Sequence, residues 1–195
     1  MSLITPHLYL GNARNAQDIN FLKSKKISFI INCAKELPNY FPNTSLQYLR
    51  LDLNDLPTQP IDQALTTSSD VILNNINKGV VTFVHCAAGI SRSSSVVIYA
   101  IMKLHDWPFE TSYRFVKEMH PNTHPNPGFV DQLIKMQQGG QHETEIITEE
   151  PGVYGVENTV QSEEVTSLTL DNEHPRPSYA RSAKNTYSKI FSGSV

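Results

Sequence analysis

The sequence contains only two cysteines, Cys33 and Cys86. Two thiols are too few for a disulfide framework or a cysteine-rich zinc site, and we expect a reducing, intracellular compartment. The sequence also lacks an apolar run of about 18 residues and the layout of a signal peptide, so we expect neither a membrane span nor secretion. The formal net charge of −3 gives no general basic character that would attract nucleic acid.

Residues 139–195 lack the features of a folded domain. They contain no lysine or arginine up to residue 175 and no aspartate or glutamate after it, and they are rich in Ser, Thr, Glu and Asn. Their apolar residues follow no sustained helical or strand period. This composition predicts a mostly disordered C-terminal tail, which leaves residues 1–138 as the folded domain.

Residues 1–138 alternate between strand-like and helix-like segments. Short apolar or alternating runs predict strands at residues 7–12, 27–34, 46–53 and 80–85. Helical patterns are found at residues 13–26, from Pro60 to Gly79, and at 93–104, 110–119 and 128–138. Residues 93–104 are apolar nearly all round, so this helix should be buried. Strand–helix alternation of this kind predicts an α/β fold with a largely parallel sheet.

The stretch HCAAGISRS, residues 85–93, carries the strongest chemical signal. Ligands of open α/β sheets bind beyond the carboxyl ends of the strands, and Cys86 lies at such an end. The following helix start offers unpaired N–H groups and a positive dipole end to an oxyanion. Arg92 adds a planar fork that can grip two phosphate oxygens, and the same positive field would hold Cys86 as a thiolate. A Walker-type nucleotide loop is disfavoured because this loop has no lysine.

This stretch resembles the signature of the cysteine-dependent phosphatases, and its small neutral residues resemble those of dual-specificity protein phosphatases. The resemblance extends over roughly residues 3–138 and includes ITPHLYLGN, YLRLDLNDLPTQPI and HPNPGFVDQL. It implies a central, mostly parallel five-stranded sheet flanked by helices, and a small atypical member without an upstream docking domain. Two departures are His120, where arginine is common, and Ser112, where alanine is usual. We expect neither to touch the chemistry.

Expulsion of an alkoxide or phenolate requires a proton donor, and DLNDLP offers Asp52 and Asp55. Asp52 fits the alternating strand pattern and is expected to be a solvated residue at the strand end. Asp55 lies where a loop should begin, and the resemblance also places the general acid there. Asp55 is therefore the predicted acid and Asp52 the alternative.

The resemblance implies a two-step mechanism without metal or cofactor. Cys86 would be the nucleophile, Arg92 would bind the phosphate and the transition state, Asp55 would be the general acid and base, and Ser93 would ease departure of the thiolate. His85 is expected to orient the loop rather than act as a base. The phosphate-binding residues would be those of the loop and the helix start: Ala87, Ala88, Gly89, Ile90, Ser91 and Arg92.

Cys33 ends a predicted strand that, in this fold, neighbours the strand of Cys86. The resemblance makes Cys33 a candidate redox partner that could trap oxidised Cys86 as a disulfide. The alternative is that Cys33 only fills the core.

The expected substrate is a phosphoprotein, a protein kinase among the candidates, with phosphotyrosine and phosphoserine/threonine both accepted. Phosphoinositide-directed relatives usually carry lysines in the signature loop, and this loop has none. Two alternatives stay open: a phosphatase of a lipid, RNA or glucan phosphoester, and a non-catalytic phosphoprotein-binding adaptor. We expect the protein in the cytoplasm, or also in the nucleus.

Overall fold

The computed structural model describes residues 1–138. Five strands form one sheet in the order β1-β2-β5-β3-β4. The strands are β1 (Ser2–Thr5), β2 (Leu8–Gly11), β3 (Phe29–Ala34), β4 (Gln47–Leu53) and β5 (Thr82–His85). The helices are α1 (Ala13–Ala16), α2 (Ile19–Ser24), α3 (Asp62–Asn77), α4 (Arg92–His105), α5 (Phe109–Met119) and α6 (Pro127–Gln138). The predicted tail at 139–195 lies outside the described residues.

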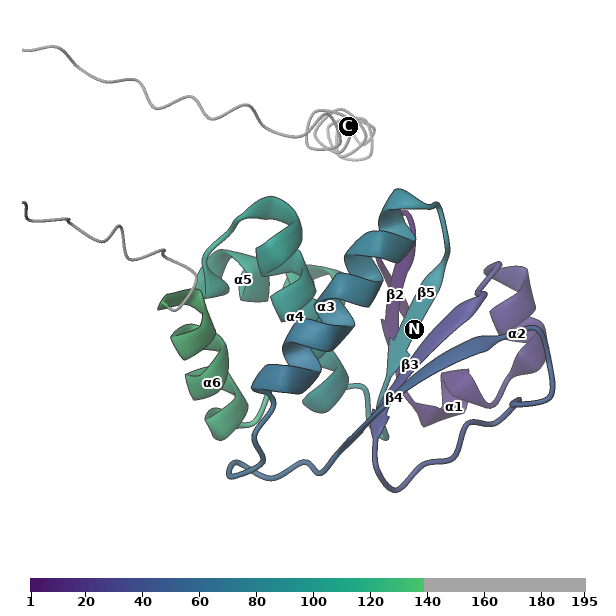
Figure 1. Ribbon diagram of the computed structural model, residues 1–195, viewed down its shortest axis with the longest axis horizontal. Helices are drawn as coiled ribbons and strands as arrows, with labels where there is room; N and C mark the ends of the chain where they lie inside the picture. Colours follow the sequence, from purple (N-terminus) through teal and green to yellow (C-terminus); the bar gives the residue numbers. More distant parts are fainter. Residues whose placement is uncertain (139–195) are drawn as a thin grey trace, which may run out of the picture. The chain divides into compact units, whose positions relative to one another are not determined.

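The sheet is mostly parallel, as predicted. Only β1 runs antiparallel to its neighbour, β2, while the β2–β5, β5–β3 and β3–β4 pairs are all parallel. The helices cover both faces of the sheet: α1 and α2 lie on one side, and α3 to α6 lie on the other (Figure 1). Because β3, β4 and β5 are parallel, their carboxyl ends meet at one edge of the sheet, which is where the motif of residues 85–93 begins.

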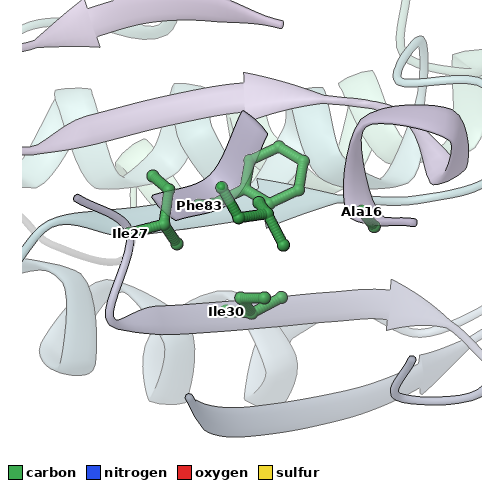
Figure 2. Packing of buried hydrophobic residues seen from close by; sticks show 5 residues of the cluster. Ala16, Ile27, Ile30 and Phe83 are labelled. Carbon is green, nitrogen blue, oxygen red and sulfur yellow. The ribbon is translucent and has the colours of Figure 1, made fainter. Parts of the chain in front are cut away.

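Apolar side chains from the strands and the short helices build the core on the α1–α2 face. Figure 2 shows these side chains gathered around the ring of Phe83, with Ile30 on the neighbouring strand β3. The cluster consists of Ala16, Leu22, Ile27, Ile30 and Phe83. Phe83 is fully buried. This packing holds β5 against the α1–α2 face of the sheet, and so it also positions the loop that follows β5.

Helix α4 is the most deeply buried helix of the fold, as its all-round apolar pattern predicts. Every residue from Arg92 to Met102 is buried. Its first residue, Arg92, is the arginine of the motif, so the start of the helix is held inside the domain. A left-handed residue, Asp106 (φ 53°), ends the helix.

The predicted helix at 13–26 is two short helices. The Asn12 side chain caps α1 by accepting the N–H of Asn15, and the Asp18 side chain caps α2 by accepting the N–H of Phe21. Asx residues favour caps over helix interiors because their short side chains bond nearby backbone groups. The apolar spacing of this segment spans both helices, so spacing alone does not show the break at Asp18.

Two other boundaries differ from the sequence prediction. Helix α3 begins at Asp62 rather than at Pro60, and the Gln132 side chain from α6 accepts the N–H of Ile61 at 2.8 Å. Strand β1 is absent from the strands that the pattern predicts, and only the resemblance of ITPHLYLGN to the opening strands of the family indicated it. Within residues 1–138, no helix is long and apolar enough to cross a membrane.

A bulge near the end of β4 sets the direction of the chain beyond it. Asn32 pairs with Arg50, whereas Ala34 pairs with Leu53, so β4 has one extra residue there. Asp52 takes up the irregularity with a left-handed φ of 49°. Bulges of this kind re-aim the following side chains and are common beside active sites. Here the bulge precedes Leu53 and Asp55, which both reach the motif loop.

Candidate active site

The loop between β5 and α4 depends on one glycine for its shape. Gly89 has a φ of +74°, and a Cβ there would lie 2.7 Å from the carbonyl oxygen of Gly11. Both the backbone conformation and the close approach therefore require glycine. The carbonyl of Ala87 accepts the N–H of Ala13 at 3.1 Å, so the start of α1 anchors the loop from outside.

Cys86 lies at the base of this loop, with 1% of its surface exposed. Its Sγ accepts the N–H of Gly89 and the hydroxyl of Ser93, each at 3.2 Å. Two donors, one from the loop and one from the first turn of α4, therefore hold this sulfur at the start of the helix.

Arg92 is buried, and its Nε is a buried donor that stays unpaired within residues 1–138. Its Nη1 donates to Glu36 Oε2 at 2.7 Å and to the carbonyl of Leu53 at 3.1 Å. Its Nε is buried and has no hydrogen-bond partner among residues 1–138, since Asp55 Oδ2 is 3.6 Å away. A buried donor without a partner is costly unless a ligand satisfies it. Protein groups within residues 1–138 thus hold the guanidinium through Nη1, and Nε is left free to donate to an oxyanion.

The hydrogen bond from Arg92 lowers the pKa of Glu36, so this carboxylate stays ionised beside the fork. Burial alone lowers the pKa of Arg92, but the bond to Glu36 and the nearby acidic groups raise it. Glu36 did not figure among the predicted site residues. Glu36 lies two positions beyond the end of β3, beside the carboxyl end of β5. This location is the sequence feature that could have identified it as a site residue.

Asp55 reaches the loop, and Asp52 does not. Asp55 Oδ1 accepts the hydroxyl of Ser91 at 2.6 Å and the side-chain amide of Asn126 at 2.8 Å. The N–H of Asn126 in turn donates to the hydroxyl of Ser91 at 3.1 Å. Asp52 instead pairs with Arg50 at 2.7 Å, with 57% of its side chain exposed. Of the two carboxylates that the sequence offered, the structure brings only Asp55 to the cysteine loop.

His85 is enclosed and neutral. Its ring stacks on Phe83 at 5.4 Å, and burial lowers its pKa to about 4. Its Nδ1 lies 3.4 Å from the carbonyl of Cys86, and because a carbonyl only accepts, Nδ1 carries the hydrogen. A neutral ring that donates to the backbone fits the expectation that His85 orients the loop.

His120, which we expected not to touch the chemistry, contacts the backbone of the cysteine loop but none of the four predicted catalytic side chains. Its Nε2 lies 2.9 Å from the carbonyl oxygen of Gly89, and its Nδ1 lies 2.9 Å from Ser2 Oγ. The other departure, Ser112, has a buried hydroxyl that finds no partner within residues 1–138. The sequence gives no direct sign of the His120 contact, because 31 positions separate it from Gly89.

Cys33 lies beside Cys86, as the fold implied. Asn32 of β3 pairs with His85, the last residue of β5, and a cysteine follows each of these two residues in the chain. Both cysteines are buried and free. Burial raises the pKa of the Cys33 thiol well above its ordinary value, and the charge of Cys86 raises it further. Cys33 is therefore a protonated thiol next to the motif cysteine.

A cysteine at the end of a parallel strand, a loop of backbone amides, a buried arginine and a carboxylate over the loop together define the class of cysteine-dependent phosphatases. The chain belongs to the dual-specificity phosphatase family, as its motif predicted. The family model described as "Dual specificity phosphatase, catalytic domain" matches residues 8–139.

Known relatives agree with this assignment. The chain is 38% identical over 131 residues to Dual specificity protein phosphatase 14 of Mus musculus, a match that covers 67% of this chain and 66% of that protein. It is 37% identical over 132 residues to a Protein phosphatase Slingshot homolog of Xenopus laevis, which covers 68% of this chain and 19% of that protein. The chain therefore spans less than two thirds of either relative. The crystal structure of DUSP15 superposes with a TM-score of 0.66 at 31% identity, over 70% of this chain and 86% of that one.

Proposed function

We propose that this protein hydrolyses phosphotyrosine and phosphoserine/threonine in phosphoproteins through a phosphocysteine intermediate. The observation that carries the proposal is the pairing of Cys86, held by two hydrogen-bond donors, with Arg92, whose buried Nε has no partner among residues 1–138. An oxyanion bound there would satisfy the orphan donor and lie against the thiolate. Positioning and charge stabilisation of this kind provide most of the catalysis in phosphoryl transfer.

The first step forms the phosphocysteine. The Cys86 thiolate attacks phosphorus in line, an S–P bond forms, and the P–O bond to the leaving group breaks. Asp55 gives its proton to the leaving oxygen. The hydrogen bonds from Ser91 and Asn126 hold the Asp55 carboxyl against the loop that would bind the phosphate.

The second step releases phosphate. Asp55, now a carboxylate, takes a proton from water, the water oxygen bonds to phosphorus, and the S–P bond breaks. The hydroxyl of Ser93 lies 3.2 Å from Sγ and donates to the sulfur as negative charge returns to it. Cys86, Arg92, Asp55 and Ser93 therefore each have a stated role in the same cycle.

A phosphoprotein substrate is favoured by the composition of the loop. Residues 87–91 carry no charge, so they offer a monophosphate ester only backbone amides and one arginine, and no extra cations for a polyphosphorylated headgroup. A site that accepts both phosphotyrosine and phosphothreonine suits kinase activation loops, which are ordered by phosphorylation of such residues. We propose a phosphorylated protein kinase as the substrate class. Two free thiols fit the reducing cytoplasm or nucleus, and imaging of the tagged protein tests that location.

One panel assay tests the function. Purified protein is incubated without added metal with a phosphotyrosine peptide, a phosphothreonine peptide, a peptide carrying both groups, a phosphoinositide and a 5′-triphosphate RNA. We expect turnover of the three peptides above the other two substrates. Cys86→Ser should bind tungstate but abolish turnover, and Arg92→Lys should impair both, because a point charge cannot reproduce the fork. Turnover of the lipid or the RNA alone would replace the proposal, and absence of all turnover with retained binding would indicate an adaptor.

A further inference from the structure

His120 contacts the cysteine loop but is not one of the residues to which the proposed mechanism gives a role. It follows α5 directly, and only 8% of its surface is exposed. Its Nε2 must carry the hydrogen in the 2.9 Å contact with Gly89, since the carbonyl oxygen can only accept. Burial lowers the pKa of His120, which favours the neutral ring. In that form Nδ1 accepts the hydroxyl hydrogen of Ser2, also at 2.9 Å, and both ring nitrogens are used.

Gly89 joins this contact to the nucleophile. Its N–H donates to Cys86 Sγ at 3.2 Å, while its carbonyl accepts from His120. A left-handed glycine has little steric restraint of its own, so the hydrogen bonds on either side decide how its two peptide planes turn. Ser94 Oγ contacts the same carbonyl at 3.4 Å, a longer contact. The short bond from His120 is therefore the main restraint on that carbonyl.

The orientation of this carbonyl sets the orientation of the next amide. The Gly89–Ile90 peptide bond is trans, so its C=O and N–H point in opposite directions. When His120 holds the carbonyl outward, the N–H of Ile90 turns toward the inside of the loop, where an oxyanion would be bound. Release of the carbonyl would let this plane rotate and would also loosen the Gly89 N–H that serves Cys86.

We propose that His120 is a positioning residue of the phosphate-binding loop, which acts by donating from Nε2 to the Gly89 carbonyl. The inference rests on the proposed function, because it concerns how the same loop binds the transferred phosphoryl group. It gives a role to a position at which the sequence departs from the residue common in the family. It also ties β1 to the loop, since Ser2 fixes the ring from the other nitrogen.

Two amide substitutions separate the nitrogens of the ring. The amide nitrogen of glutamine can occupy the place of Nε2, whereas the shorter asparagine side chain reaches only the place of Nδ1. His120→Gln should therefore keep the bond to Gly89, and His120→Asn should lose it while it keeps a polar partner for Ser2. His105→Asn is the matched control. This half-buried histidine stacks on Trp107 at 4.3 Å and lies at the opposite end of α4 from Arg92, about 20 Å away at 1.5 Å per residue.

The main readout is the affinity for tungstate, an oxyanion that binds the loop without turnover, measured by calorimetry on the full chain. Loss of a buried hydrogen bond is worth roughly 1–3 kcal/mol, which corresponds to about 5- to 150-fold in affinity. We expect His120→Asn to bind tungstate at least about 5-fold more weakly than wild type. His120→Gln should stay within about 3-fold, and His105→Asn should bind as wild type does. Iodoacetate should alkylate Cys86 more slowly in His120→Asn than in wild type, and at nearly the wild-type rate in His120→Gln and His105→Asn.

The outcomes distinguish this proposal from its parent. A folded His120→Asn that binds tungstate as tightly as wild type overturns the role of His120, and so does a folded His120→Gln as weak as His120→Asn. Another outcome is that wild type and the variants show the expected order of tungstate affinity while wild type hydrolyses no phosphopeptide. In that case the proposed function fails and the positioning role stands. Thermal unfolding of each variant identifies folded protein. If His120→Asn does not fold, His120→Gln alone decides, because weak binding by folded His120→Gln contradicts the proposal.

Discussion

Glu36 provides the most direct test of how the arginine fork is held. Its Oε2 lies 2.7 Å from Arg92 Nη1, and we expect its removal to weaken catalysis without disrupting the fold. The two side chains differ sharply in environment, since 51% of the Glu36 side chain is exposed but only 6% of that of Arg92. Solvent therefore screens the pair, while loss of the bond leaves a buried donor less well satisfied.

These environments bound the size of the effect. An exposed ion pair contributes about 0.2–1 kcal/mol, and a hydrogen bond to a charged group contributes about 1.5–3 kcal/mol. The Leu53 carbonyl still accepts from Nη1 at 3.1 Å when Glu36 is gone, which places the loss near the lower range, at about 1 kcal/mol. Glu36→Ala should then lower kcat/KM for an aryl phosphate about 5-fold. Glu36→Gln keeps an acceptor and should lower it about 2-fold.

The assay is steady-state hydrolysis of an aryl phosphate with tungstate as a competitive inhibitor. Asp52→Asn is the matched control, because Asp52 is a similarly exposed carboxylate that also lies 2.7 Å from an arginine. The pKa of Glu36 is lowered, so its charge and its stabilising contribution are present above the ordinary value of 4.5 and are lost as the pH falls through the lower folded-state pKa. The difference between wild type and Glu36→Gln should therefore be constant from pH 7 to about pH 5. Equal activity of Glu36→Ala and wild type, or an equal loss in Asp52→Asn, would refute the reasoning.

Three further perturbations test the acid, the loop and the tail. Asp55→Asn should slow turnover of a phenyl phosphate by roughly 10²–10⁴-fold and much less for a substrate with a good leaving group, while a larger loss in Asp52→Asn would reassign the acid. Gly89→Ala should lower the free energy of unfolding by at least about 1–2 kcal/mol, measured in urea, because it forces a left-handed φ on alanine. Its Cβ also meets the Gly11 carbonyl, so unchanged stability would contradict the described loop. Truncation after Gln138 should preserve hydrolysis of small phosphoesters, and combined loss of activity and thermal stability would show that residues 139–195 support the domain.

The sequence predicted those parts of the fold that depend on the pattern of apolar residues within one segment. Buried parallel strands read as continuous apolar runs, and α4 reads as apolar all round, so both were correctly placed. The break at Asp18 and the bulge at Asp52 were not, since each depends on how one short polar side chain or one backbone angle meets its neighbours. The spacing of apolar residues therefore does not reveal the break or the bulge.

The candidate site divides in the same way. Cys86, Ser91 and Arg92 lie within seven residues of one another, so a short motif contains them. Glu36 and His120 reach the same loop from 56 and 31 positions away in their contacts with Arg92 and Gly89. Such contacts arise only when the sheet order and the helix ends are fixed in space. They determine how the arginine and the glycine are oriented, which the motif alone leaves open.

The position of Cys33 supports a redox hypothesis that the sequence raised. Peroxide would oxidise the Cys86 thiolate to a sulfenic acid, and the sulfur of Cys33 would attack it to form an S–S bond with release of water. Burial is the main cause of the raised pKa of Cys33, and the charge of Cys86 is a further cause. Because the sulfenic acid is neutral, oxidation of Cys86 removes this cause and makes Cys33 easier to deprotonate. Oxidation of the nucleophile would therefore make the trap more reactive, although burial still raises the pKa of Cys33.

A peroxide pulse followed by dithiothreitol tests this trap. Wild type should recover its activity, because the disulfide shields Cys86 from irreversible oxidation to the sulfinic acid. Cys33→Ser should be as active before the pulse but should not recover after it, since serine cannot form the bond. Mass spectrometry of the oxidised wild type should detect a 33–86 cross-link. Equal recovery of both proteins without that cross-link would show that Cys33 only packs the core, since the neighbouring thiol would then have no part in protecting the nucleophile.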